Sequence, residues 1–84
     1  MLDNLLKSNI AIVGGGNFCK KLLQLLFSEP FEDYHPTVLG VADVDNQAEG
    51  RVLADQQGIF TTADYRELYD LKELQILLEL SPDG

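Results

Sequence analysis

Four short apolar runs alternate with segments of helical pattern, and this alternation most limits the folds that the chain can adopt. The runs cover residues 10–13, 37–44, 59–61 and 74–80. Strands that are apolar along their whole length are typical of a parallel sheet covered by helices on both faces. The sequence therefore predicts an α/β domain of order βαβαβαβ with a four-stranded parallel sheet.

The segments between the runs carry helix signals. Residues 17–27 have apolar side chains at helical spacing, and we expect the row of Phe18, Leu22 and Leu26, with Cys19 and Leu23 beside it, to form one wide buried face. Such an amphipathic pattern predicts a helix that packs against the sheet.

Helix-end signals mark two further segments. Residues 45–58 predict a second helix with Asp45 or Asn46 as its N-cap, and with Gly58 in the left-handed conformation after its end. The segment DYRE (64–67) has capping-box spacing, with Asp in place of Ser or Thr, and predicts a short third helix.

Three consecutive glycines separate the first apolar run from the first helix. Gly14, Gly16 and Cys19 occupy the positions of a G-x-G-x-x-G/A motif, with Cys in place of the last Gly or Ala. In this motif the first glycine allows a tight turn, the second lets a pyrophosphate approach the backbone, and the third position brings the helix close to the sheet. The N–H groups at the helix start then hold the anion. Gly15 occupies a variable position of the motif, where we expect most residues to be accepted.

Asp43 comes near the end of the second apolar run and is the second candidate binding group. A carboxylate there can accept hydrogen bonds from both hydroxyls of an adenosine ribose, and it repels a 2′-phosphate. No basic residue follows before Arg51, so the sequence favours NAD over NADP. The alternative stays open: the glycines form a plain turn between strand and helix, and Asp43 caps the next helix.

The sequence resembles the N-terminal half of the cofactor domain in the glucose–fructose oxidoreductase/inositol dehydrogenase family. The resemblance covers roughly residues 9–82 and rests on IAIVGGGNF, VLGVADVDNQAEGRVLADQQGI, DYREL and the apolar strand that closes in Ser-Pro. It implies a single, partial NAD(P)-binding Rossmann domain over 1–84, with sheet order 3-2-1-4, helices on both faces, and truncation relative to a full domain. It also implies the cofactor-binding residues Gly14, Gly15, Gly16, Asn17, Phe18, Asp43, Ser81 and Pro82.

The sequence departs from this family at Gln75, where the family usually has Asp before the fourth strand, and at Glu79. Glu79 replaces an aliphatic residue, and the segment LLELS is closer to homoserine dehydrogenases and to Rossmann modules that precede some bacterial sensor kinases. A buried unpaired carboxylate is costly, so we expect Glu79 to be partnered or at a sheet edge. The family's catalytic lysine, in a Glu-Lys-Pro turn, has no counterpart in these 84 residues. Whether the parent protein is an enzyme stays open.

The composition argues against two classes of partner. The net charge of −8, with six Lys and Arg and no basic cluster, argues against nucleic-acid and anionic-membrane surfaces. The single cysteine, Cys19, cannot form an internal disulfide and suits a reducing compartment. We find no signal peptide and no run near the roughly 18 apolar residues that a membrane span needs, and predict a cytoplasmic protein.

The sequence thus predicts a dinucleotide-binding or adenine-nucleotide-binding module of NAD(H) type, a fragment of a larger oxidoreductase or signalling protein. The alternative is a degenerate Rossmann scaffold for protein interaction or dimerisation without a cofactor. The fourth apolar run would form an open sheet edge, and such edges pair readily with other chains. We therefore expect a homodimer through this edge.

Overall fold

A parallel four-stranded sheet forms the centre of the molecule. The computed structural model describes residues 8–28 and 36–80. In sheet order the strands are β3 (Phe60–Thr62), β2 (Thr37–Ala42), β1 (Asn9–Val13) and β4 (Ile76–Glu79). All neighbouring pairs are parallel. The predicted order 3-2-1-4 is confirmed.

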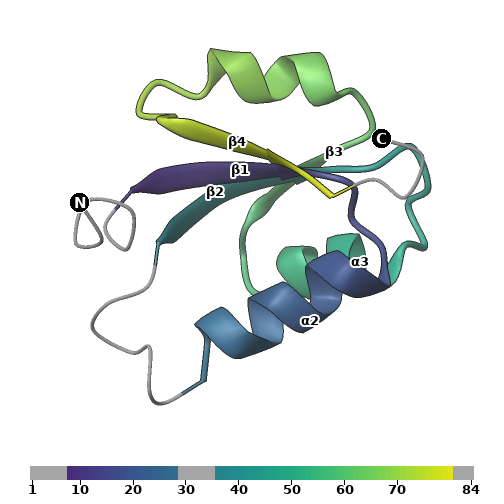
Figure 1. Cartoon of the computed structure of the whole chain (residues 1–84). Coiled ribbons are helices and arrows are strands. Elements are labelled where there is room, and N and C mark those ends of the chain that lie inside the picture. Colours follow the sequence, from purple (N-terminus) through teal and green to yellow (C-terminus); the bar gives the residue numbers. More distant parts are fainter. Residues whose placement is uncertain (1–7, 29–35, 81–84) are drawn as a thin grey trace.

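Helices cover both faces of the sheet (Figure 1). The helices α2 (Asn17–Leu26) and α3 (Glu49–Gln56) lie on one face, and the 3-10 helix η2 (Tyr65–Asp70) lies on the other. The cluster on the α2 and α3 side contains the buried residues Ile12, Cys19, Leu23, Val41 and Ala54. The cluster on the η2 side contains Ala11, Ala42 and Leu68. Because β1 contributes to both clusters, it has no polar face, as its sequence predicts.

The buried face of α2 is narrower than the predicted one, because Phe18 is not part of it. Cys19, Leu23 and Leu26 are buried, whereas Phe18 is 69% exposed. Residues three and four apart share a helix face, so the row that begins at Cys19 faces the sheet while Phe18 lies beside it. The prediction that Phe18 is buried is therefore wrong.

Of the two predictions for the ends of α3, the one for its N-terminus is wrong and the one for its C-terminus is confirmed. Its N-cap is Ala48, and no described side chain caps it. The Asp45 carboxylate instead accepts from the Gln47 N–H at 2.9 Å, which closes a turn before the helix, so the prediction of Asp45 or Asn46 as N-cap is wrong. Gly58 has a φ of 79°, and its predicted left-handed conformation is confirmed.

The third predicted helix is present as η2, with half of its capping box. The Asp64 carboxylate accepts from the Arg66 N–H at 3.0 Å. Glu67 does not reach back to the Asp64 N–H; its carboxylate bonds the hydroxyl of Thr62. That hydroxyl oxygen also accepts from the Asp64 N–H at 3.1 Å. Thr62, the last residue of β3, therefore completes the cap.

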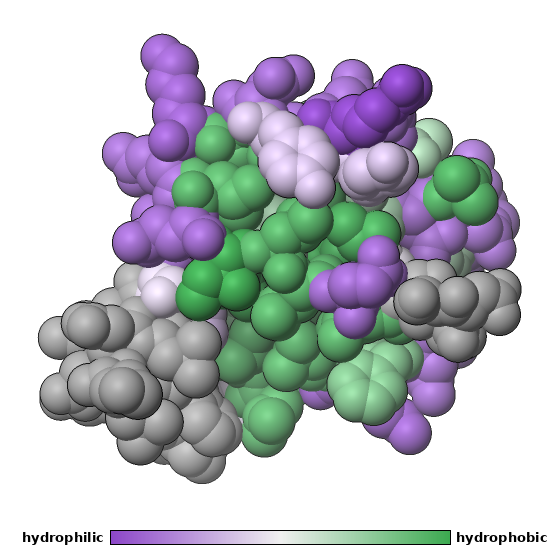
Figure 2. Space-filling model, turned by 45° about the horizontal axis from the view of Figure 1, so that its top comes forward, coloured by the Kyte–Doolittle hydropathy of each residue, from purple (hydrophilic) through white to green (hydrophobic). Residues whose placement is uncertain are grey.

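β4 forms one edge of the sheet and contributes to an apolar surface. Its residues Ile76, Leu77 and Leu78 are half-buried, and Glu79 at its end is exposed, as expected for an edge position. Figure 2 shows apolar side chains gathered over the middle of the face that η2 and β4 present. Among the described residues, no helix has the length and hydrophobicity to cross a membrane.

Candidate functional site

The turn from β1 into α2 begins at Gly14. This residue has a φ of 104°, in the left-handed region that favours glycine. Its N–H donates to the Ala42 carbonyl at 2.8 Å, which continues the β1–β2 pairing to the end of β2. The tight-turn role that the sequence predicts for Gly14 is consistent with both features.

Gly15 is constrained by packing rather than by conformation. A Cβ at this position would lie 3.0 Å from the Cβ of Arg51 and 3.2 Å from the Cβ of Asp43. The Arg51 N–H donates to the Gly15 carbonyl at 2.9 Å, which holds the first turn of α3 against the glycine loop. A side chain at position 15 would therefore make these neighbours shift by a few tenths of an ångström, so the position is tighter than the sequence indicates.

Gly16 is the N-cap of α2, and the space beside it is open. Its φ of −83° suits any residue, and no described heavy atom lies within 4 Å of where its Cβ would be. No described side chain caps the helix, and its first turn carries no acidic residue. The first N–H groups of a helix have no partner within the helix. They and the helix dipole therefore create a site of positive potential at Gly16.

Asp43 follows β2 and points into the glycine loop. Its Oδ2 accepts from the Gly15 N–H at 2.8 Å, and its Oδ1 accepts from the Asp45 N–H at 2.9 Å. A carboxylate has about four acceptor positions, so these two bonds leave others for a ligand. Asp43 does not cap α3, whose N-cap is Ala48. That part of the alternative interpretation is wrong.

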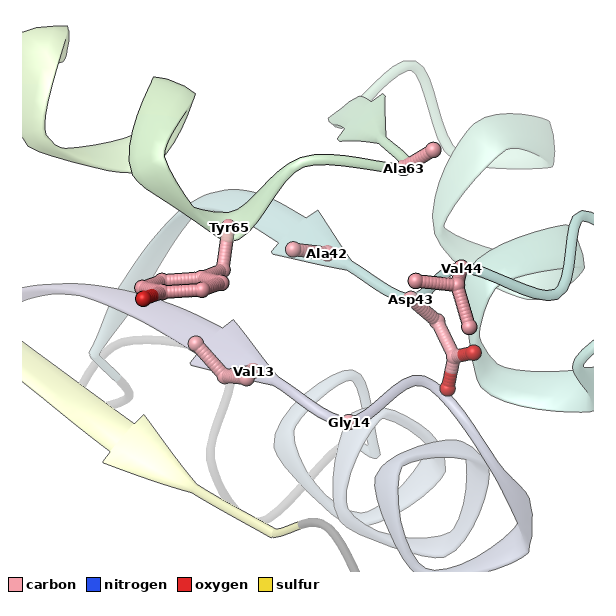
Figure 3. Close-up of a pocket in the computed structure, with 7 residues that line it drawn as sticks. All are labelled: Val13, Gly14, Ala42, Asp43, Val44, Ala63 and Tyr65. Atoms are coloured by element: carbon pink, nitrogen blue, oxygen red, sulfur yellow. The ribbon is translucent and has the colours of Figure 1, made fainter.

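A hollow of about 160 Å³ lies at the carboxyl ends of β1, β2 and β3. It is lined mainly by apolar groups, from Val13, Gly14, Ala42, Asp43, Val44, Ala63 and Tyr65. In Figure 3 the Tyr65 ring lies near Val13 and Ala42, whereas the Asp43 carboxylate points away from the ring. The hollow therefore has an aromatic wall at one end and a carboxylate at the other.

Sequence reasoning missed Val44, Ala63 and Tyr65. The signal for them was available, because the carboxyl ends of parallel strands meet at one edge of a sheet. Residues that follow β2 and β3 therefore belong to the same edge as the glycine loop.

Cys19, the third position of the glycine motif, lies in the core. It is fully buried and packs against Gly50 of α3, where an added Cβ would come within 2.7 Å of the Cys19 Cβ. Burial, with a smaller contribution from the negative charge of Asp43, raises the pKa of its thiol to about 11. The thiol is thus protonated at neutral pH and is a poor nucleophile. Among the described residues, no group of three His, Cys, Asp or Glu could hold a metal ion.

The other four residues predicted to bind the cofactor are Asn17, Phe18, Ser81 and Pro82. Asn17 and Phe18 form the start of α2, so their main-chain N–H groups belong to the helix N-terminus. The Phe18 side chain lies on the outer surface, where it lines an apolar hollow with Leu22 and Leu25. Ser81 and Pro82 lie outside the described residues.

The strand order and the two helical layers define a Rossmann-like α/β fold. No protein-family model, curated protein or solved structure matches this chain. The resemblance to the glucose–fructose oxidoreductase/inositol dehydrogenase family stays a prediction, and the function is inferred from the geometry of the site.

Proposed function

We propose that this chain binds the ADP portion of an NAD(H)-type dinucleotide at the carboxyl edge of its sheet. The observation that carries the proposal is the open space at Gly16, the uncapped N-terminus of α2. Main-chain N–H groups and a helix dipole attract an anion without basic side chains. This agrees with a chain of net charge −8 that has no basic cluster.

Two neighbouring groups support an adenosine next to that diphosphate. The Asp43 carboxylate keeps acceptor positions for the ribose hydroxyls, beside the loop that would hold the phosphates. The hollow at Tyr65 offers apolar walls and an aromatic ring to a flat base. Because a carboxylate repels a 2′-phosphate, NAD is favoured over NADP.

The replacement Gly16→Asp tests the proposal with effects of opposite sign. Aspartate is at least as good an N-cap as glycine, so the free energy of unfolding should be unchanged or rise by a few tenths of a kcal/mol. The same carboxylate would occupy the anion site and repel the diphosphate. We expect calorimetric titration with ADP, NAD⁺ and NADH to show binding to the wild type and more than tenfold weaker binding to the variant.

Two further variants help to interpret the titration: one controls for the added charge, and the other tests the proposed ribose contact. Gln24→Glu adds the same charge at an exposed site on α2 and should leave binding unchanged. Asp43→Ala should weaken adenosine-containing ligands more than pyrophosphate alone, because it removes the proposed ribose contact. If the wild type binds none of these nucleotides at millimolar concentration, or if Gly16→Asp binds them as well as the wild type does, the proposal is wrong.

A second candidate function is a scaffold that dimerises through β4. The observation in its favour is the half-buried apolar row of β4 at the sheet edge. This function needs no cofactor, so failure of the nucleotide titration would leave it as the better proposal.

A further inference from the structure

One flank of α2 is apolar and exposed, on the side away from α3. Phe18 is 69% exposed and Leu25 is 52% exposed, and together with Leu22 they line a hollow of about 200 Å³. A helix turns by about 100° per residue, which places these three side chains on one flank. Lys20, on the opposite flank, lines a hollow with residues of α3. The apolar flank of α2 is therefore separate from its buried face, which begins at Cys19.

This apolar flank adjoins the β4 edge of the sheet. α3 contacts β2 and β3, and α2 covers the part of the same face that lies toward β4 (Figure 1). Leu22 of α2 and Leu78 of β4 pack against the same buried cluster, as does Leu80 directly after β4. The edge of β4 and the flank of α2 therefore form one apolar surface.

β4 alone is too small for a stable interface. A standard interface between proteins buries about 800 Å² on each partner. β4 has four residues, which makes it about 13 Å long. A dimer that pairs through this edge consequently needs further contacts, and aromatic side chains are the ones that most often provide the binding energy.

A two-fold axis perpendicular to the sheet at β4 would supply those contacts from α2. Helices pack about 8–10 Å apart, which is about two strand spacings. With α3 over β2 and β3, α2 lies over β1 and β4. Two copies with antiparallel β4 strands would then have both α2 helices on one face, at about the same packing distance.

The charge of α2 is compatible with a second copy as the partner. α2 contains two lysines and no acidic residue, although the chain carries a net charge of −8. Lys21 borders the apolar hollow, and its long side chain can keep the ammonium group in water. Contact through α2 therefore brings no negative charges together.

We infer that the apolar flank of α2 is a self-association surface, on which Phe18 and Leu25 pack against α2 of a second copy beside the paired β4 strands. This inference rests on the second candidate function, dimerisation through β4, and it does not require nucleotide binding. It gives the exposed Phe18 side chain a role in the dimer.

The replacements Phe18→Gln and Leu25→Gln test the inference by sedimentation velocity over a range of concentrations. Each removes two apolar side chains per dimer, because the axis is two-fold, so the dissociation constant of the dimer should rise by at least about tenfold. Glutamine is neutral and a good helix former, so α2 should keep its structure. Thermal unfolding of each variant checks this.

Tyr69→Gln is the matched control, because Tyr69 is an aromatic residue of similar exposure, 62%, on η2 at the other face of the sheet. It should leave the dissociation constant unchanged. If both α2 variants dimerise as tightly as the wild type, or if Tyr69→Gln weakens the dimer as much as they do, the inference is wrong while pairing through β4 stands. If the wild type stays monomeric at high micromolar concentration, both the inference and the second candidate function are wrong.

Discussion

The three glycines before α2 differ in what the fold requires of them. Gly14 needs a positive φ, and Gly15 lies against Arg51 and Asp43, where a Cβ would fit only tightly. Gly16 has neither constraint, because its φ is ordinary and its surroundings are open. Only at Gly16 does the fold itself give no reason for glycine. A ligand that approaches the backbone there would supply one.

Cys19 makes the free energy of unfolding depend on pH in the alkaline range. Its thiol has a pKa of about 11 in the folded chain and an ordinary value of 9.0. Below pH 9 the thiol is protonated in both states, so its contribution to stability is fully present. As the pH rises from 9 to 11, the unfolded chain loses this proton first. The free energy of unfolding should therefore fall by on the order of 2 kcal/mol.

Urea unfolding of the wild type and of Cys19→Ala across this pH range measures the effect. The two proteins differ only at this residue, so the difference between their free energies of unfolding isolates the thiol. We expect the two stability curves to converge as the pH approaches 11. Parallel curves would show that burial does not perturb this cysteine.

Among the helices, α2 and α3 approach each other closely where α3 begins. At Gly50 an added Cβ would lie 2.7 Å from the Cβ of Cys19 and 2.8 Å from the carbonyl oxygen of Gly15. Neither neighbour is the far end of a flexible side chain. The contact therefore fixes α3, and Arg51 with it, against the glycine loop.

Gly50→Ala should destabilise the fold although alanine is the better helix former. In an open helix the exchange stabilises by up to about 1 kcal/mol. Here the overlap with Cys19 and Gly15 should outweigh that gain and lower the free energy of unfolding by about 1–3 kcal/mol. Urea denaturation measures this, with the exposed Gln56→Ala as a control that stays within about 0.5 kcal/mol. An unchanged or raised midpoint for Gly50→Ala would mean that the helices can separate without cost.

The sequence predicts the elements better than it predicts the contacts between them. Apolar runs identify the strands because the central strands β1 and β2 contribute buried side chains to both faces of the sheet, and the φ of Gly58 follows from its place after a helix. The packing roles of Gly15 and Gly50 depend on how closely α3 approaches the glycine loop, which no local pattern records. The same approach brings the Arg51 guanidinium to the main-chain carbonyl of Asp43, a contact that the eight-residue spacing in the sequence does not predict.

At the scale of the whole molecule, the two edges of the sheet differ. The β3 edge is short and ends in Thr61 and Thr62. The β4 edge carries the apolar row of Ile76, Leu77 and Leu78, and the apolar surface of Figure 2 lies over it. An exposed parallel edge of this kind favours pairing with another chain. A second copy related by a two-fold axis would place two β4 strands antiparallel and extend the sheet across both molecules.

We expect this homodimer to form at high micromolar concentration and to strengthen with salt. Each copy carries a net charge of −8, and added salt screens the repulsion between copies while it leaves apolar contacts intact. Sedimentation velocity at low and at physiological ionic strength measures both effects. Ile76→Lys places a charge at the start of β4 and should give a monomer, whereas Phe60→Lys, at a partly exposed site on the opposite edge, should still dimerise. A wild-type monomer at every salt concentration would exclude the dimer, and loss of the dimer in Phe60→Lys alone would assign the interface to β3.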